Sequence, residues 1–161
     1  MTFNFCLCLC LDLTLTFEFL LLTFEHERML KLEIVTPERR VLDAEVDSVT
    51  VPTASGEAGI LPNHASLVSA LNPGILTYTQ KSVSDRFAVS SGFIEVNADK
   101  VSVMVDTAES AGEIDVDLAR ASREAAEKMI ASLLTAPVEE TEAAREQLEA
   151  AQARLQLAAG K

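Results

Sequence analysis

The chain has 161 residues, of which 25 are acidic and 13 are basic, so its net charge at pH 7 is −12. This length indicates one domain, or a small domain with an appendage. The acidic balance argues against nucleic acid as the main partner, because phosphate binding needs a concentrated basic surface.

The first segment, residues 1–28, has an unusual apolar pattern. Phe or Leu occupies every odd position from Phe3 to Phe19, which is typical of a one-faced strand. A signal peptide is disfavoured because no positive charge precedes the apolar run and no small-residue cleavage site follows it. Two acids, Asp12 and Glu18, disfavour a transmembrane helix.

All three cysteines lie within the first ten residues, spaced as Cys-x-Cys-x-Cys. A metal site there would have no clear fourth ligand apart from His26. The rest of the chain needs no disulfides and fits a reducing compartment. We expect residues 1–28 to be a low-complexity leader outside the native fold, and Met29 to be the true start.

Residues 30–107 are rich in β-branched residues and turn signals, which predicts a β domain. The Asn97–Asp99 stretch marks a tight hairpin turn, and strand signals recur about every 8–12 residues, so we predict an antiparallel sandwich or barrel. The predicted strands are 30–35, 44–53, 74–80, 86–96 and 100–107, with Val46, Val49 and Val51 as candidate core residues.

The stretch GEAGILPNHA, residues 56–65, interrupts the strand pattern with two glycines and a proline. We predict a sharp connection with a short strand, with Glu57 at a loop tip available to a partner. His64 is predicted to be a structural or interface residue, because no carboxylate is evidently placed to orient it. No nucleophile elbow, phosphate loop or paired-histidine motif occurs, so we expect no enzymatic activity from the isolated chain.

Two helices are predicted after the β domain, the first over 116–134 and the second after Thr135–Pro137. Asp115 is expected to cap the first helix, and Asp117 suits its positive end. The predicted apolar stripes are Leu118, Ala121, Ala125, Met129 and Leu133 on the first helix, and Ala144, Leu148, Ala151, Leu155 and Ala158 on the second. Alanine side chains bury little apolar area. The sequence is therefore compatible with an antiparallel hairpin that can open and equally with one that is static.

Three stretches in this order resemble one known family. They are GEAGILPNHASLVSALNPGIL, FAVSSGFIEVNADKVSVMVDTAE and IDVDLARA. They look like the epsilon subunit of bacterial F-type ATP synthases, from about Met29 to the C-terminus. The leader has no counterpart in the family.

The resemblance implies a β + α fold: an antiparallel β-sandwich of two sheets over residues 29–112, followed by an antiparallel two-helix hairpin over 113–161. It implies a non-catalytic rotor subunit of the central stalk that binds the gamma subunit and the c-subunit ring. Such a subunit couples proton-driven rotation to ATP synthesis on other subunits, at the cytoplasmic face of the bacterial plasma membrane. By position, Glu57 resembles a residue facing the c ring and His64 one near the gamma contact.

The resemblance also implies that the hairpin can extend to the alpha and beta subunits of the catalytic head and inhibit ATP hydrolysis. Inhibitory tails of the family use basic residues. Here the second helix offers only Arg145 and Arg154, with Lys161 at the end, among several glutamates. This departure argues against strong inhibition.

Some family members bind ATP through a motif at the start of the first helix, which Val116–Ala121 matches except at its first position. The resemblance implies weak ATP binding by Asp117 and Arg120, and no other cofactor or metal. Helix capping by Asp117 and a solvated Arg120 is the alternative, and Glu127 stands where binders carry a basic residue. The competing functions are a free-standing nucleotide-sensing module and a small β-sandwich enzyme that uses His64 or clustered carboxylates.

Overall fold

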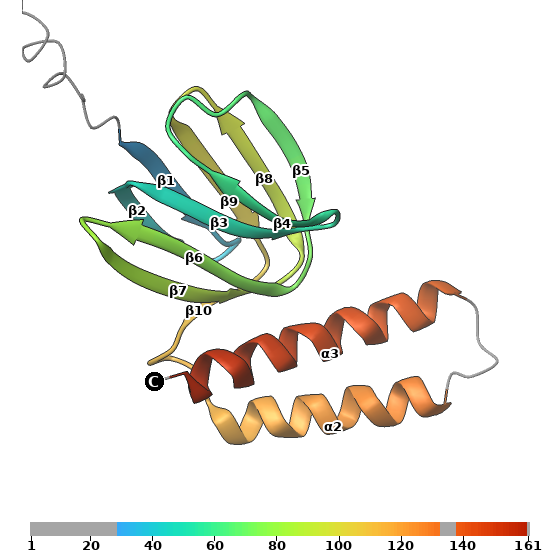
Figure 1. The fold of residues 1–161 in the computed structure, drawn as a ribbon. Helices are drawn as coiled ribbons and strands as arrows, with labels where there is room; N and C mark the ends of the chain where they lie inside the picture. Colours follow the sequence, from blue (N-terminus) through green and yellow to red (C-terminus); the bar gives the residue numbers. More distant parts are fainter. Residues whose placement is uncertain (1–28, 133–137, 161) are drawn as a thin grey trace, which may run out of the picture.

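The structure is a computed structural model that describes residues 29–132 and 138–160. Within these residues, ten strands precede two helices (Figure 1). The strands are β1 (Leu30–Val35), β2 (Arg40–Val46), β3 (Ser48–Thr53), β4 (Gly56–Ile60), β5 (Leu67–Leu71), β6 (Gly74–Gln80), β7 (Val83–Val89), β8 (Gly92–Asn97), β9 (Lys100–Val105) and β10 (Ala108–Ser110), and the helices are α2 (Val116–Ser132) and α3 (Val138–Ala159). The predictions for residues 1–28 and for Thr135–Pro137 lie outside the described residues.

The strands form two layers that face each other, as predicted (Figure 1). One layer has the order β10-β7-β6-β3 with β4 on β3, and the other has the order β5-β8-β9-β1-β2. The sheet forks at β3, which pairs with β6 along Ser48–Thr50 and with β5 only at Thr53. At the far edge β2 approaches β6, where Gln80 Nε2 donates to the Glu45 carbonyl over 2.8 Å. Just beyond β2, the Asp47 amide donates to the Thr79 carbonyl over 2.7 Å. The sandwich is therefore almost closed into a barrel.

One pairing departs from the antiparallel expectation. β1 pairs with β9 in parallel, whereas every other pair within the described sheet is antiparallel. A parallel pair needs a long crossover between its strands. The seven strands between β1 and β9 supply that crossover here.

The core between the layers consists of large aliphatic side chains. Val46, Val49 and Val51 are fully buried, so their prediction as core residues is confirmed. The other fully buried large residues of the sandwich are Leu30, Leu32, Ile34, Ile60, Leu76, Ile94, Val96, Val101 and Val103. Each fills an inward position of a strand whose neighbours point outward, as the two-residue period of a strand requires.

Two of the predicted strands are in fact pairs of strands. The run 44–53 breaks at Asp47, because Val46 and Val49 both face the core although they are an odd number of residues apart. A continuous strand would place them on opposite faces. The run 86–96 breaks for the same reason between Val89 and Ile94. The strands β5 and β10 were not among the predicted strands.

The first helix begins as predicted but buries a different face. Asp115 Oδ1 accepts from the amides of Asp117 and Leu118 at 3.0 and 3.1 Å, which confirms the cap. The predicted stripe is wrong, because Leu118 is 67% exposed and Met129 is 47% exposed. The buried residues of α2 are Ala119 and Ala126, one position later in sequence. Leu133, the last residue of that stripe, lies outside the described residues.

The second helix is the middle element between α2 and the sandwich (Figure 1). Its predicted stripe is buried or half-buried, with Ala144 and Ala151 almost fully inaccessible. On another face Ala153 and Leu157 are also buried. Two positions along a helix differ by about 200°, so Ala151 and Ala153 point to opposite sides. α3 therefore buries one face on α2 and the other on β6 and β7.

Candidate functional site

Exposed apolar side chains gather on the outer face of the layer β5-β8-β9-β1. Phe93 is 58% exposed and Met104 is 45% exposed, and they are direct partners across β8 and β9. Ala70 pairs with Phe93 on one side, and Val35 pairs with Met104 on the other, so one row crosses four strands. Val68, 72% exposed, lies two residues from Ala70 on the same face. We call Val35, Val68, Ala70, Phe93 and Met104 the outer apolar row.

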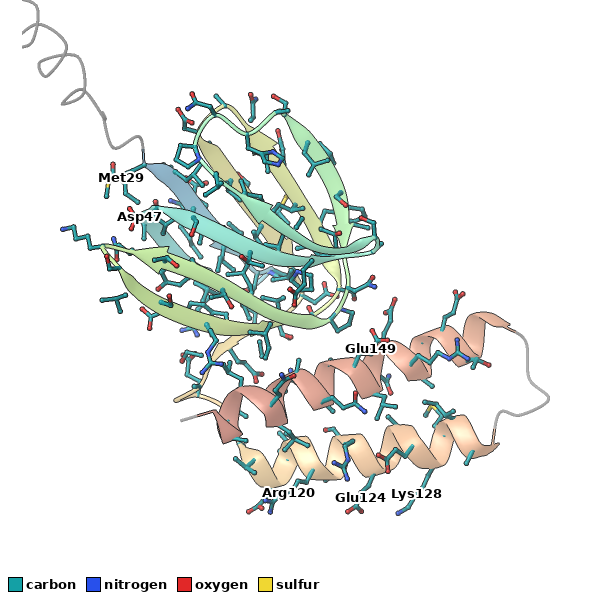
Figure 2. All side chains as sticks on the ribbon, in the orientation of Figure 1. Met29, Asp47, Arg120, Glu124, Lys128 and Glu149 are labelled. Carbon is teal, nitrogen blue, oxygen red and sulfur yellow. The ribbon has the colours of Figure 1, made fainter. Side chains whose placement is uncertain are left out.

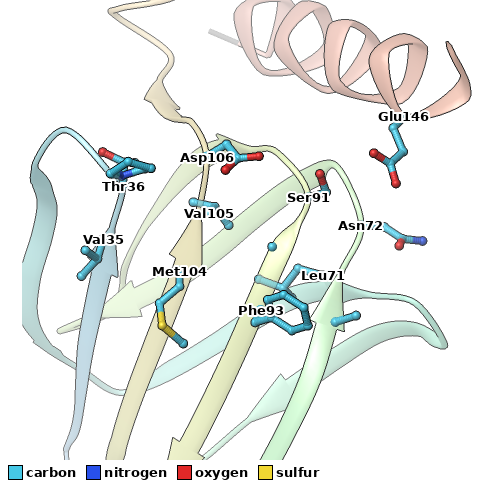
Figure 3. Close-up of a pocket in the computed structure, with 13 residues that line it drawn as sticks. Val35, Thr36, Leu71, Asn72, Ser91, Phe93, Met104, Val105, Asp106 and Glu146 are labelled. Carbon is cyan, nitrogen blue, oxygen red and sulfur yellow. The ribbon is translucent and has the colours of Figure 1, made fainter. Parts of the chain in front are cut away.

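A groove opens where this row reaches the end of the strands (Figure 3). Its volume is about 580 Å³. Phe93 and Met104 lie at its apolar side, while Asn72, Asp106 and Glu146 bring polar groups (Figure 3). Glu146 comes from α3, which passes over the groove. The groove is lined by aliphatic, aromatic, hydroxyl, amide and carboxylate groups, a mixture that suits the docking of a partner.

The other half of the same face is charged. The Glu33 carboxylate lies 2.9 Å from Lys100 Nζ and 3.2 Å from Lys31 Nζ, and Lys31 also reaches Asp43 at 3.6 Å. The hydrogen bonds from Lys100 and then Lys31 hold the pKa of Glu33 below its usual range. Glu33 thus ties β1 to β9, and Lys31 extends the network to Asp43 on β2. The outer face consequently has an apolar half and a charged half.

Glu57 stands near the tip of the β3–β4 hairpin, as the loop-tip prediction required. It is exposed and is the cross-strand partner of Pro52. The turn depends on Gly56, whose φ of 121° disfavours other residues, and on the Thr53 hydroxyl, which donates to the Gly56 carbonyl over 2.7 Å. The fold therefore presents the Glu57 carboxylate on a tight, well-defined hairpin.

His64 lies in the turn beyond the other end of β4, away from Glu57. Its amide donates to the Leu61 carbonyl over 3.0 Å, and its Nδ1 donates to the Ala65 carbonyl over 2.8 Å. A carbonyl oxygen only accepts, so Nδ1 carries the proton. This imidazole is tied to its own turn, and the structure does not join it with Glu57 in one site.

Asp117 and Arg120 lie on the first turn of α2. Asp117 is almost fully exposed, and its carboxylate is 3.8 Å from Arg120 Nη1. Arg120 lines a crevice of about 460 Å³ between α2 and the end of α3, together with Arg123 and Leu155. Figure 2 shows Arg120 with Glu124 and Lys128 along α2. The structure thus brings Arg120 beside Arg123, whereas Asp117 does not line the crevice.

The sequence reasoning missed Arg123 and the outer apolar row. Arg123 follows Arg120 by three residues, a helical spacing that predicts neighbouring side chains. Its Nε is 3.2 Å from Glu127 Oε1, so Glu127 holds it along the helix. The sequence also contained a signal for the outer apolar row. Phe93 and Ile94 are adjacent in β8 and point to opposite faces, so both faces of this strand are apolar.

The described residues show neither a metal-binding cluster nor a membrane-spanning helix. No group of three or more His, Cys, Asp or Glu side chains there is arranged to hold a metal ion. No helix in the described part of the chain has the length and apolar character needed to cross a membrane.

Comparison with known proteins gives a consistent result. Residues 29–111 match the family described as "ATP synthase, Delta/Epsilon chain, beta-sandwich domain". An ATP synthase epsilon chain of Moorella thermoacetica is 47% identical over 102 residues, covering 63% of this chain and 76% of that protein. An ATP synthase epsilon chain of Anaeromyxobacter sp. (strain K) is 46% identical over 104 residues, covering 65% and 79%.

Solved structures share the fold. A chain in the cryo-EM structure of the Euglena gracilis mitochondrial ATP synthase has a TM-score of 0.67 at 24% identity, covering 85% of this chain and 87% of that chain. A chain in the central stalk and c-ring structure of the Tetrahymena thermophila mitochondrial ATP synthase has a TM-score of 0.55 at 16% identity, covering 82% and 98%.

Proposed function

Since this chain belongs to the delta/epsilon family of ATP synthase subunits, we propose that its outer apolar row is the surface that docks on the gamma subunit. The chain is a rotor-stalk subunit of an F-type ATP synthase, and the proposal concerns which of its surfaces makes which contact. The observation that carries it is the row itself: Phe93 and Met104 are exposed side by side on a rigid sheet. Contiguous exposed apolar side chains on a small domain mark interaction sites.

The charged half of the outer face complements this docking surface. An interface with an apolar centre and a polar rim is the usual arrangement in protein complexes. Here the rim is formed by Glu33, Lys31, Lys100 and Asp43 beside the row. Such a rim orients the partner more than it adds affinity. His64 lies in a turn of the same sandwich, and we place it near the gamma contact.

The contact with the c-subunit ring is assigned to the β3–β4 hairpin. Glu57 is exposed near its tip, and the turn is fixed by Gly56 and Thr53. A rigid tip with a carboxylate suits the polar loops of a membrane ring. In this arrangement the sandwich transmits ring rotation to gamma, at the cytoplasmic face of the bacterial inner membrane, and does no chemistry itself.

The gamma assignment is tested by charge substitution in the apolar row. Phe93→Asp in the full chain should weaken binding to purified gamma subunit by about 100-fold, because a buried aromatic anchor is lost and a carboxylate must be desolvated. Val83→Asp is the matched control, since Val83 is equally exposed but lies on β7, outside the row. Binding is measured by calorimetry or co-sedimentation. Equal weakening by both variants, or none by Phe93→Asp, would contradict the assignment.

The hairpin provides regulation of ATP hydrolysis in our proposal. It lies on the sandwich in this structure, and its buried residues are mostly alanine, so detaching it exposes little apolar area. In the extended position it would meet the alpha and beta subunits of the catalytic head. Adding the full chain back to a catalytic head depleted of its own epsilon subunit, and comparing ATPase rates, tests this part.

Weak nucleotide binding is a second candidate function, favoured by one observation. Two guanidinium groups, those of Arg120 and Arg123, line the crevice between the helices. Paired guanidiniums bind phosphate oxygens in a charge-assisted manner. Calorimetry of the full chain with ATP tests it, and Arg120→Gln should remove any heat of binding. If the chain binds ATP and the Arg120→Gln variant binds it equally well, the nucleotide site lies elsewhere.

A further inference from the structure

The attachment of α3 to the sandwich is polar at its C-terminal half. Arg154 Nε lies 3.0 Å from Glu109 Oε2, and its Nη2 lies 3.1 Å from Glu109 Oε1, which makes a two-pronged ion pair. The same Nη2 is 3.4 Å from Thr107 Oγ1. The side chains of Arg154 and Glu109 are only 27% and 33% exposed. A bidentate, partly covered pair is stronger than an ordinary surface pair.

A second polar contact is made at the very end of α3. Arg86 Nη2 on β7 donates to the Gly160 carbonyl over 3.1 Å. The last carbonyls of a helix have no partner within the helix and carry partial negative charge. A guanidinium from the sandwich satisfies one of them. Arg86 therefore binds the hairpin through the helix backbone rather than through a side chain.

The apolar part of the attachment is small by comparison. On the sandwich side α3 buries Ala153 and Leu157, and Leu157 lines one cavity with Tyr78 and Phe87. One leucine and one alanine remove little apolar surface from water. The polar contacts therefore weigh heavily in deciding whether the hairpin stays attached. Arg145, the other arginine of α3, is exposed, and no such contact to the sandwich is seen for it within the described residues.

We propose that Arg154 with Glu109, and Arg86 with the Gly160 carbonyl, form a polar latch that holds the hairpin on the sandwich. Opening the latch detaches α3 without unfolding either part. Salt weakens the latch, since it screens a partly exposed ion pair. The regulatory meaning of this motion rests on the function proposed above, but the latch itself is a property of the isolated chain.

Thiol labelling of the full chain tests the latch. Ala153→Cys, with the three leader cysteines replaced by serine, places one thiol under the docked helix. Its labelling rate, divided by the rate of the same variant in denaturant, reports how often α3 is detached. We expect Arg154→Gln and Glu109→Gln each to raise this ratio about fivefold, the change that the loss of one such ion pair produces. The matched control, Arg145→Gln, removes the same charge from the same helix and should leave the ratio unchanged.

Two further measurements separate a latch from a general loss of packing. The exchanged pair Glu109→Arg with Arg154→Glu should restore most of the protection, because the charges then meet with reversed signs. Raising the salt concentration should increase labelling of the otherwise unchanged chain but not of Arg154→Gln. The latch proposal is wrong if the thiol in Arg154→Gln is labelled no faster than in Arg145→Gln. It is also wrong if the labelling rate does not depend on salt concentration. Binding to gamma is measured separately on the same variants, so a failure of the proposed function leaves the labelling result unaffected.

Discussion

The sandwich and the helical hairpin bury side chains of different size. The sandwich core consists mainly of leucine, isoleucine and valine. Among the described residues of the hairpin, the buried ones are Ala119, Ala126, Ala144, Ala151 and Ala153, with Leu157 as the one large side chain that is fully buried. Burial of apolar area contributes about 25 cal/mol per Å², so a core of large side chains is far more stabilising than alanine seams. The sandwich is therefore a rigid platform, and the hairpin is a part that can be moved.

The largest loss of stability is expected at Gly92, where the backbones of β8 and β9 approach too closely for a side chain. A Cβ on Gly92 would overlap the Met104 carbonyl oxygen and lie 2.9 Å from Val105 Cα. Gly92→Ala should therefore destabilise the sandwich by on the order of 5 kcal/mol, measured by urea unfolding. Gly59→Ala is the control, since nothing lies within 4 Å of a Cβ there. Similar losses for both variants would show that the close approach of β8 and β9 is not what limits residue 92.

A core truncation should cost somewhat less. Ile94 is fully buried between the layers, and Ile94→Ala should lower the free energy of unfolding by about 4 kcal/mol through lost burial and the remaining cavity. Phe93→Ala, one residue earlier on the exposed face, should cost less than about 1 kcal/mol. Urea midpoints of the two variants measure the difference. A larger loss for Phe93→Ala would mean that the outer apolar row is part of the core.

The same truncation in the hairpin should affect only the hairpin. Leu157→Ala should destabilise the attachment of α3 by about 2–3 kcal/mol, because Leu157 is the largest side chain buried there. Amide hydrogen exchange should then accelerate in α3 and remain slow in β8. Leu118→Ala makes the same chemical change at an exposed position of α2 and should have little effect. A loss of stability in both helices and strands together would remove the distinction between platform and movable part.

Removal of the helix cap should have a smaller effect. Asp115 Oδ1 accepts from two amides at the start of α2, so Asp115→Ala should cost about 1 kcal/mol of helix stability. Circular dichroism during thermal unfolding measures the helical signal. Asp115→Asn retains the acceptor and should restore most of it. If the alanine variant melts unchanged, α2 is held by α3 alone.

The smallest change in stability is expected when the pH is lowered. The pKa of Glu33 is lowered first by Lys100 and then by Lys31. An unfolded glutamate titrates near pH 4.3, about its reference value, so the ion pair stabilises the sandwich fully above that pH. This contribution is lost as the pH falls through the lowered pKa of the folded state. Glu33→Gln should flatten the pH dependence of the urea midpoint below about pH 5, because the carboxylate that titrates is then absent. An unchanged pH dependence in this variant would contradict the role given to Glu33.

Sequence periodicity located most of the strands and the two helices, because most strands alternate between core and surface. It failed to place the ends of strands where the alternation of inward and outward side chains shifts by one residue. Asp47 separates two strands only because Val46 and Val49 must both face inward, and that requirement is set by the fold as a whole. The weak local signal of β5 was hidden in the Gly- and Pro-rich stretch before it.

The buried face of α2 could not be read from its own sequence. Alanines occur all round this helix, so the stripe with Leu118 and the one with Ala119 are both compatible with a helical period. Close approach to α3 selects the face with the smaller residues. The pair Arg154 and Glu109 was equally hidden, since 45 residues separate the partners in sequence and no local pattern joins them. Contacts between elements are decided by packing rather than by periodicity.

The parallel pairing of β1 with β9 has a consequence for synthesis of the chain. β1 lies inside its layer, yet Lys31 pairs with Lys100 and Val35 with Met104. During translation β1 and β2 can close as a local hairpin, but β1 must wait with one open edge until β9 has left the ribosome. Late pairing of distant strands is slow and exposes unpaired backbone. The nascent chain therefore reaches its folded platform only when translation is well past the ninth strand.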